Sequence, residues 1–280
     1  MGSGAVSPET IQNFQRYLLR EERAEATITK YLHDVRVFSS YLAGTAVTKE
    51  RVIGYKDWLK NNYSTGSVNS MLAAVNSFLM FSGWEECKVK LLKVQRQLFC
   101  EEQRELEKSE YFRLVQTARE QKKDRLVLIL QTLCSLGLRI SELRFVRVNA
   151  IKCGKLQIYN KGKNRNVILP EKLRRQLLSY CRNCHIKAGE IFITRSGKSV
   201  DRSNIWREMK KLCEAAKVMR AKIFPHNLRH LFARTYYELK KDVVKLADIM
   251  GHSNIETTRI YTMTSGKEYK KQMENLGLVL

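Results

Sequence analysis

Proline and glycine are scarce in this sequence, which contains three prolines and 14 glycines in 280 residues. This composition excludes collagen-like and low-complexity disordered chains. Also missing are an apolar run near the ~20 residues that a membrane-spanning helix needs and the basic start followed by an apolar stretch that marks a secretory signal. With 44% hydrophobic residues, the sequence predicts an ordered, helix-rich protein that has no membrane-spanning segment and is located in the cytoplasm.

Acidic residues are few relative to basic ones: 28 Asp and Glu stand against 51 Lys and Arg, a net charge of +23. Residues 1–100 hold 13 basic and 9 acidic side chains, whereas residues 101–280 hold 38 and 19. The basic excess of the C-terminal part favours a polyanionic partner, because each neutralised phosphate releases condensed counterions. A membrane surface, an acidic protein, or charge that serves solubility alone are the alternatives.

The seven cysteines are odd in number and no secretory signal precedes them, which indicates reduced thiols. Cys181 to His185 fit the C-x-x-C-H pattern of covalent haem attachment. However, residues 171–189 have the periodicity of an amphipathic helix, and no second ligand pair follows at the spacing that a zinc site needs. We therefore expect neither haem nor zinc in this segment.

Apolar residues recur at helical spacing in four runs of the first ninety residues, which begin near Ile11, Ile28, Val52 and Met71. Ser7 followed by Pro8 is a typical helix start. The four runs predict a helical bundle over residues 8–86. Residues 87–108 change to dense charge and are interpreted as a linker.

The second part, residues 109–280, is predicted to combine helices with a small sheet. Residues 155–170 contain two short strand-like runs around a basic turn, which predicts a β-hairpin. Residues 190–194 are a candidate third strand. The rest has helical periodicity and ends in a basic amphipathic tail at residues 266–280. The predicted fold class is therefore mainly α with a small antiparallel β-sheet in the second domain.

Six polar residues of the second part lie in specific local settings: Arg139, Lys161, His226, Arg229, His252 and Tyr261. Each alone has a plain structural explanation, such as a surface charge or a half-buried packing residue. Together they suit an anionic oxygen cluster, because guanidinium groups bind phosphate oxygens bidentately. They do not suit a two-metal site, which needs clustered carboxylates, since Glu142 and Asp248 are the only acids near these motifs.

The remaining histidines and tryptophans are interpreted as structural residues. His33 and His230 are interpreted as structural histidines, because neither stands in a specific setting. The tryptophans are interpreted as core residues: Trp58, Trp84 and Trp206.

Four segments carry a resemblance to a known family. They are "GLRISEL" (137–143), "NKGKNRNVIL" (160–169), "PHNLRHLFART" (225–235) and "IMGHSNIETTRIYT" (249–262). In order and spacing they resemble the catalytic boxes of the tyrosine recombinases, the integrase family that includes the Xer proteins and phage integrases. The likeness covers about residues 8–280. Departures from the usual family pattern remove no catalytic group; they fall at Cys134, Ser135, Asn160 and Met263.

The resemblance implies a two-domain DNA clamp. Residues 8–86 would form a four-helix core-binding (SAM-like) domain, residues 87–108 the linker, and residues 109–280 an α+β catalytic domain with a C-terminal tail. The implied activity is site-specific recombination, in which DNA strands are cleaved and rejoined through a 3′-phosphotyrosine without metal, ATP or another cofactor.

The resemblance also implies a role for each of the six residues. Tyr261 would be the nucleophile, and His226 would accept and return its proton. Arg139, Arg229 and His252 would hold the non-bridging phosphate oxygens. Lys161 would protonate the leaving 5′-oxygen; the same turn also holds Lys163 and Arg165. Further DNA contacts are expected from Arg144, Lys163, Arg165 and Lys222.

The expected partner is double-stranded DNA with inverted-repeat core sites. Four protomers would assemble on it, the free protein being a monomer or weak dimer, and the bound protein would be associated with a bacterial nucleoid. The tail at residues 266–280 would dock either on a neighbouring protomer or on its own domain. Two alternatives remain: a type IB topoisomerase, which relaxes DNA with a similar tyrosine, and a DNA-binding protein that retains the fold without the chemistry.

Overall fold

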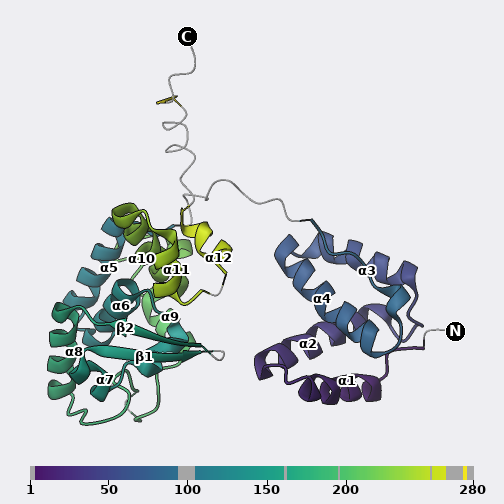
Figure 1. The fold of residues 1–280 in the computed structure, drawn as a ribbon, viewed down its shortest axis with the longest axis horizontal. Coiled ribbons are helices and arrows are strands. Elements are labelled where there is room, and N and C mark those ends of the chain that lie inside the picture. Colours follow the sequence, from purple (N-terminus) through teal and green to yellow (C-terminus); the bar gives the residue numbers. More distant parts are fainter. Residues whose placement is uncertain are drawn as a thin grey trace. The chain divides into compact units, whose positions relative to one another are not determined.

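The chain divides into two compact units, Met1–Arg96 and Gln97–Leu280. The computed structural model describes residues 4–93, 105–160, 163–194, 196–252, 254–262 and 274–275. Within these ranges the chain is mainly helical and carries one two-stranded antiparallel sheet (Figure 1). The predicted fold class is confirmed. No helix in the described ranges has the length and apolar character that a bilayer crossing requires.

The N-terminal unit contains the four predicted helices and a short 3₁₀ helix: α1 (Pro8–Arg20), α2 (Glu25–Leu42), α3 (Lys49–Asn62), α4 (Thr65–Phe81) and η1 (Glu85–Cys87). Three of the helices begin at a side-chain cap, since Ser7, Thr48 and Ser64 each accept a hydrogen bond from the backbone three residues on. The predicted start of α1, a Ser7 cap with Pro8 in the first turn, is confirmed.

Aromatic and aliphatic side chains fill the core of this unit. Phe14 of α1 meets Phe78 of α4 edge to face, with ring centroids 5.3 Å apart. The segment after η1 is held against α4 by two asparagines: Asn76 exchanges hydrogen bonds with the backbone of Val89, and Asn69 binds that of Leu92 in the same way. The first residues of the expected linker therefore pack on the N-terminal unit.

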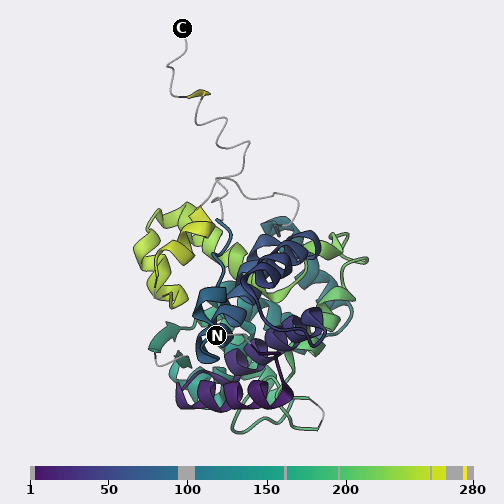
Figure 2. The same cartoon turned by 90° about the vertical axis from the view of Figure 1, so that its right-hand side faces the viewer.

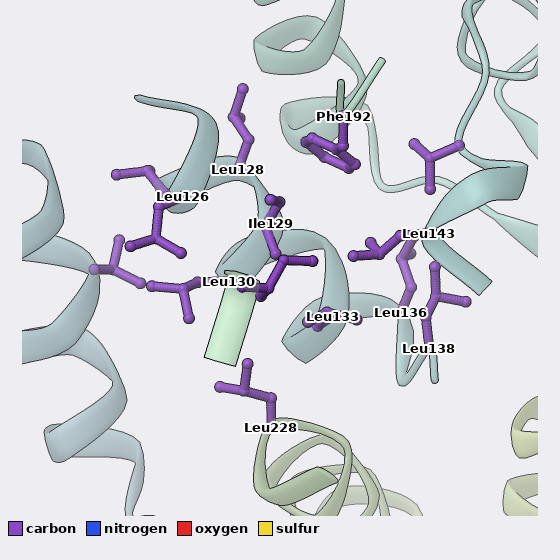
Figure 3. Packing of buried hydrophobic residues seen from close by; sticks show 14 of the residues in the cluster. Leu126, Leu128, Ile129, Leu130, Leu133, Leu136, Leu138, Leu143, Phe192 and Leu228 are labelled. Atoms are coloured by element: carbon purple, nitrogen blue, oxygen red, sulfur yellow. The ribbon is translucent and has the colours of Figure 1, made fainter. Parts of the chain in front are cut away.

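The C-terminal unit contains the remaining elements. In chain order they are α5 (Lys108–Glu120), α6 (Asp124–Leu136), η3 (Ile140–Phe145), α7 (Val148–Cys153), β1 (Lys155–Asn160), β2 (Lys163–Ile168), α8 (Glu171–Asn183), α9 (Arg202–Lys210), η4 (Arg220–Lys222), α10 (Pro225–Lys240), α11 (Val243–Met250), α12 (Glu256–Arg259) and η5 (Ile260–Thr262). Helix α6 lies at the centre of the core and buries apolar residues around most of its circumference (Figure 3).

The sheet is the predicted hairpin. Strands β1 and β2 pair antiparallel, from Lys155 opposite Ile168 to Asn160 opposite Lys163. The candidate third strand at residues 190–194 is wrong: this segment makes only isolated bridges, from Glu190 to Arg147 and from Ile193 to Ser199. The chain reverses there through a tight turn in which Thr194 N donates to the carbonyl of Lys198, so no ladder extends along the hairpin.

Helices α10, α11 and α12 lie together at one end of this unit in both views (Figures 1 and 2). Their grouping brings the start of α10 close to the turn after α11 and to η5. Two of the expected core tryptophans are instead on the surface, since Trp58 is 37% exposed and Trp206 is 47% exposed.

Candidate active site

The end of α6 sets the position of the first predicted site residue. Gly137 ends the helix in the left-handed region (φ +60°), and a Cβ added there would lie 2.4 Å from a ring carbon of Phe232. Leu138 is fully buried, and Arg139 follows as the residue that begins η3. Glycine is therefore required by both backbone conformation and packing, and the turn that it makes precedes Arg139, whose side chain binds Glu142 of η3.

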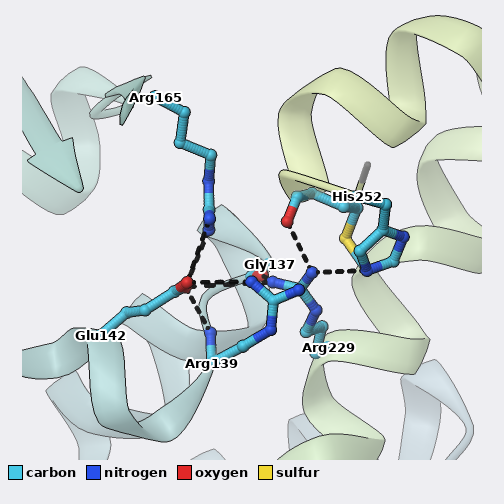
Figure 4. A network of polar contacts seen from close by, with 7 residues as sticks. Gly137, Arg139, Glu142, Arg165, Arg229 and His252 are labelled. Carbon is cyan, nitrogen blue, oxygen red and sulfur yellow. Dashed lines mark hydrogen bonds and ion pairs between the residues drawn. The ribbon is translucent and has the colours of Figure 1, made fainter. Parts of the chain in front are cut away.

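Glu142, on η3, is the centre of a network of arginines (Figure 4). Its carboxylate accepts hydrogen bonds from Arg139 N (2.8 Å) and Arg139 Nη1 (3.0 Å). Arg165 of β2 binds both carboxylate oxygens, at 3.0 and 2.7 Å. Nη1 of Arg229 lies 4.0 Å away. One carboxylate thus links η3, the hairpin and α10.

The Glu142 side chain is 1% exposed but stays ionised. Burial alone raises the pKa of a carboxyl group, yet the hydrogen bonds from Arg165 and from the backbone of Arg139 outweigh it, so the Glu142 pKa lies below its ordinary value. The buried carboxylate offsets part of the positive charge that the three guanidinium groups bring together.

Arg229, on α10, is 1% exposed and bound on three sides. Its Nη1 donates to the carbonyl of Gly137 (2.5 Å), and its Nη2 donates to the carbonyl of Met250 (2.6 Å) and lies 2.9 Å from Nε2 of His252. Burial and then the charge of Arg139 lower its pKa to about 10, so the guanidinium remains cationic near neutral pH. Arg229 therefore ties together the ends of α6 and α11.

The turn after α11 places His252 beside this guanidinium. Gly251 ends the helix at φ +67°, and an added Cβ would lie 2.6 Å from Nη1 of Arg165, so this position too requires glycine. His252 Nδ1 lies 2.8 Å from Oγ1 of Thr258. Because Arg229 can only donate, Nε2 of His252 accepts, and we assign the ring proton to Nδ1, which donates to Thr258.

Tyr261 lies in the same pocket, on η5. Its side chain is 5% exposed and packs in a cluster with Ala233, Leu246 and Met250. The ring of His252 is nearly parallel to it (19°, centroids 6.0 Å apart). Tyr261 also interacts electrostatically with Arg229. The nucleophile candidate therefore lies together with Arg229 and His252 of the same chain.

His226 opens α10 and stands at the rim of the pocket. Its ring meets that of His230, one turn further on, at 4.6 Å and 76°. Burial, followed by the charges of Arg229, Arg139 and Arg202, lowers the pKa of His226 below its ordinary value of 6.5. A neutral imidazole near pH 7 can accept a proton, as the predicted role requires.

The other predicted residues are Lys161, Lys163, Arg144, Arg165 and Lys222. Lys161 and the side chain of Lys163 are outside the described residues. Arg144 is exposed, and its guanidinium lies over the ring of Phe145 at 4.9 Å.

Arg165 and Lys222 have internal partners instead of the surface positions that phosphate contacts require. Arg165 is 13% exposed and is bound by Glu142. Lys222 is buried, with its ammonium 2.9 and 3.1 Å from the two carboxylate oxygens of Glu110. Both cations are paired with carboxylates of the same chain, and the expectation that they contact DNA stays a prediction.

Two residues of the pocket were not predicted from the sequence. Glu142 was noted only as a nearby acid, although its spacing of three from Arg139 places the two on one side of a helical turn. His230 was grouped with structural histidines, yet it lies four residues after His226 on the same face of α10. Local spacing therefore contained a signal for both, but only the fold shows which groups they meet.

The described residues contain no group of three His, Cys, Asp or Glu side chains placed to hold a metal ion. At the C-x-x-C-H pattern, Cys181 is buried on α8 and Cys184 is exposed at its end. The helix predicted there is confirmed.

Two partly buried histidines, His230 and His252, predict a loss of stability at mildly acidic pH. Burial and then nearby positive groups lower the folded-state pKa of both His230 and His252 to about 4, whereas the unfolded chain titrates near ~6.5. The unfolded state therefore binds more protons between these values, and stability falls as the pH drops from 6.5 toward 4. We expect the thermal midpoint to decrease steadily over this range.

The measurement is thermal unfolding between pH 7.5 and 4.5 for the wild type and for His252→Asn. The window ends at the upper edge of carboxylate titration, so Glu142, with its lowered pKa, contributes little to the slope. The thermal midpoint of His252→Asn is expected to decrease less steeply with falling pH than that of the wild type. A wild-type midpoint that stays constant from pH 7 to 5 contradicts the neutral, partly buried state of these rings.

The chain is similar in sequence to known proteins over both of its units. The model described as "Phage integrase family" matches residues 104–268, and that described as "Phage integrase, N-terminal SAM-like domain" matches residues 11–86. The tyrosine recombinase XerA of Thermococcus kodakarensis is 28% identical over 282 residues, which cover 97% of this chain and 96% of the relative. The TnP I resolvase of Bacillus thuringiensis is 27% identical over 292 residues, with coverage of 96% and 100%.

Solved structures extend the likeness to the fold. A λ integrase dimer bound to a COC′ core site aligns with a TM-score of 0.72 over 92% of this chain and 77% of that chain, at 14% identity. At 14% identity, this comparison shows only that the two chains share a fold.

Proposed function

The chain belongs to the phage integrase family and is a tyrosine recombinase, an enzyme of site-specific DNA recombination, and from this premise we propose that Tyr261 is its nucleophile. The observation that carries the proposal is the position of Tyr261 in one pocket with Arg229 and His252 of the same chain. A phenol with an ordinary pKa near ~10 is a weak nucleophile at neutral pH. A base and nearby positive charge activate it.

In the proposed cleavage step, the phenolic oxygen of Tyr261 forms a bond to phosphorus and the bond from phosphorus to the 5′-oxygen breaks. The phenolic proton goes to His226, whose lowered pKa keeps it neutral and able to accept. Lys161 gives a proton to the leaving 5′-oxygen. The product is a 3′-phosphotyrosine and a free 5′-hydroxyl, and attack by the 5′-hydroxyl of a partner strand reverses the step.

Arg139 and Arg229 are proposed to stabilise the charge that grows on the phosphate oxygens, and His252 is proposed to join them once the bound phosphate replaces one of its present partners, Arg229 or Thr258, and a ring N–H faces the phosphate. Pre-positioned donors of this kind contribute about 100-fold or more each to the rate. Nε of Arg229 supports this role, because it has no hydrogen-bond partner among the described residues. Since Arg229 and Tyr261 are both buried in the free chain, DNA binding is proposed to open the pocket. Guanidinium charge takes the place of a metal ion, and the covalent link retains the phosphodiester energy, so ATP is not needed.

Double-stranded DNA is the partner of this class of enzyme, and the net charge of +23 fits it. The solved relatives include a λ integrase tetramer bound to a Holliday junction. On that analogy we propose that four copies assemble on two duplexes with inverted-repeat core sites, and that the protein works in the cytoplasm, where it meets DNA.

A covalent selection tests the proposed function. A pool of nicked duplexes with a randomised inverted repeat loses the short 5′-hydroxyl strand after cleavage, so that the covalent complex accumulates. Wild-type protein in excess EDTA is expected to form a complex that survives a denaturing gel, with DNA attached to the peptide that contains Tyr261 by mass spectrometry. Attachment at another residue, or formation only with added magnesium, contradicts the proposal. Sequencing the trapped strands also identifies the core site.

A further inference from the structure

His230 contacts two residues of the proposed reaction. Its ring is 4.6 Å from that of His226 on one side and 4.6 Å from that of Tyr261 on the other, with interplanar angles of 76° and 81°. His226 and His230 are one turn apart on α10, and Tyr261 comes from η5. The imidazole of His230 is thus packed edge to face against both the proposed base and the proposed nucleophile.

The ring of Tyr261 is held from two directions. His252 lies nearly parallel to it, and hydrogen bonds with Arg229 and Thr258 fix His252 in turn. His230 lies perpendicular to it. The buried members of the same cluster, Ala233, Leu246 and Met250, are non-aromatic and fill space without favouring a ring orientation, and the partly buried aromatic side chains packed against the cluster are Phe232, Tyr236 and Tyr237. Edge-to-face contact is directional, because the positive ring edge favours the negative ring face.

We propose that His230 is a positioning residue of the recombination reaction, whose ring fixes the orientation of the Tyr261 side chain. This inference rests on the proposed function, in which Tyr261 is the nucleophile. It assigns His230 no proton transfer. The phenol and His230 share a ring contact, and no hydrogen bond joins them in the described part of the chain.

The charges around His230 support a neutral, passive ring. Burial is the main cause that lowers its pKa to about 4, followed by His226, Arg234 and Arg229. These neighbours are basic, and they disfavour protonation. A ring that stays neutral throughout the working pH range can orient Tyr261 by shape and ring electrostatics alone.

The test compares three substitutions of His230, which distinguish the contribution of an aromatic ring from that of the imidazole nitrogens. His230→Phe keeps an aromatic ring, His230→Leu keeps apolar volume without a ring, and His230→Ala removes both. We expect His230→Phe to form the covalent complex within about threefold of the wild-type single-turnover rate. We expect His230→Leu and His230→Ala to be slower by about 10- to 100-fold, the scale of a misplaced reacting group, with DNA affinity changed less than about twofold.

A second measurement needs neither DNA nor catalysis. With fluorotyrosine incorporated, the fluorine resonance of residue 261 is assigned by its loss in Tyr261→Phe. Ring currents from His230 and His252 shift this resonance. We expect His230→Phe to retain a shifted signal and His230→Leu to move it toward the position of an unpacked tyrosine, which reports orientation even where the rate is too slow to measure.

The outcomes are distinguishable. Cleavage by His230→Leu at the wild-type rate overturns the inference. Slow cleavage by His230→Phe, with one titration step missing from the dependence of its rate on pH, also overturns it, because that result assigns proton transfer to the imidazole nitrogens. Failure of the wild type itself to form a covalent complex counts against the proposed function. The orientation of the Tyr261 ring is then tested by the fluorine shifts alone.

Discussion

Tyr261→Phe is expected to abolish covalent attachment to DNA and strand exchange while DNA binding and the fold persist. The substitution removes one oxygen atom and leaves the ring that packs against His230 and His252. Without the phenolic oxygen, no bond to phosphorus forms. Loss of a catalytic nucleophile costs on the order of 10⁴- to 10⁶-fold in rate, which places the variant below detection in a gel assay.

The measurement is covalent-complex formation on the nicked substrate, alongside DNA affinity and the thermal midpoint. Tyr236→Phe is the matched control, since Tyr236 is a partly buried tyrosine of α10 packed against the same cluster as Tyr261. It is expected to cleave within about threefold of the wild type. A covalent band of normal intensity from Tyr261→Phe places the nucleophile at another residue and removes the basis of the proposed mechanism.

Several features of the site could be predicted from the sequence because short-range rules determine them. His226 and Arg229 are three apart on one helix, so helical periodicity alone places them on one face. The hairpin follows from two alternating runs around a basic turn. Gly137 and Gly251 each stand at the end of an apolar helix, where positive φ favours glycine.

Contacts between distant segments could not be predicted in this way. Glu142 and Arg165 are 23 residues apart, and Glu110 and Lys222 are 112 apart. A basic residue in a basic turn has the same local pattern whether it faces DNA or a buried carboxylate. The internal partners of Arg165 and Lys222 could not be predicted for this reason, because burial is decided by tertiary packing.

The position of Glu142 among the arginines leads to the second large effect. Glu142→Gln is expected to destabilise the C-terminal unit and to slow cleavage strongly. The neutral amide leaves Arg165 and Arg229 with less compensation for their positive charge in a buried setting, and its NH₂ group faces guanidinium donors. Breaking a buried ion pair by removing one partner typically costs about 3–5 kcal/mol. We expect the free energy of unfolding to decrease by about this amount, as measured by urea unfolding.

Cleavage should fall for a separate reason. Glu142 fixes Arg139 through its backbone and its guanidinium, and it anchors Arg165 against Gly251, beside His252. If these contacts position the phosphate-binding groups, cleavage by the folded Glu142→Gln protein should decrease by about 100-fold, the scale of one lost transition-state donor. The rate is compared at a temperature where the variant remains folded.

Glu110→Gln is the control that separates stability from catalysis. It also breaks a buried ion pair of the C-terminal unit, that with Lys222, so it is expected to lose a comparable amount of stability. Glu110 makes no contact with the pocket arginines among the described ion pairs, and its cleavage rate should stay within a few-fold of the wild type. Equal rates for the two variants would limit Glu142 to holding the fold, whereas a rate deficit confined to Glu142→Gln shows that the buried carboxylate positions the cations that the reaction uses.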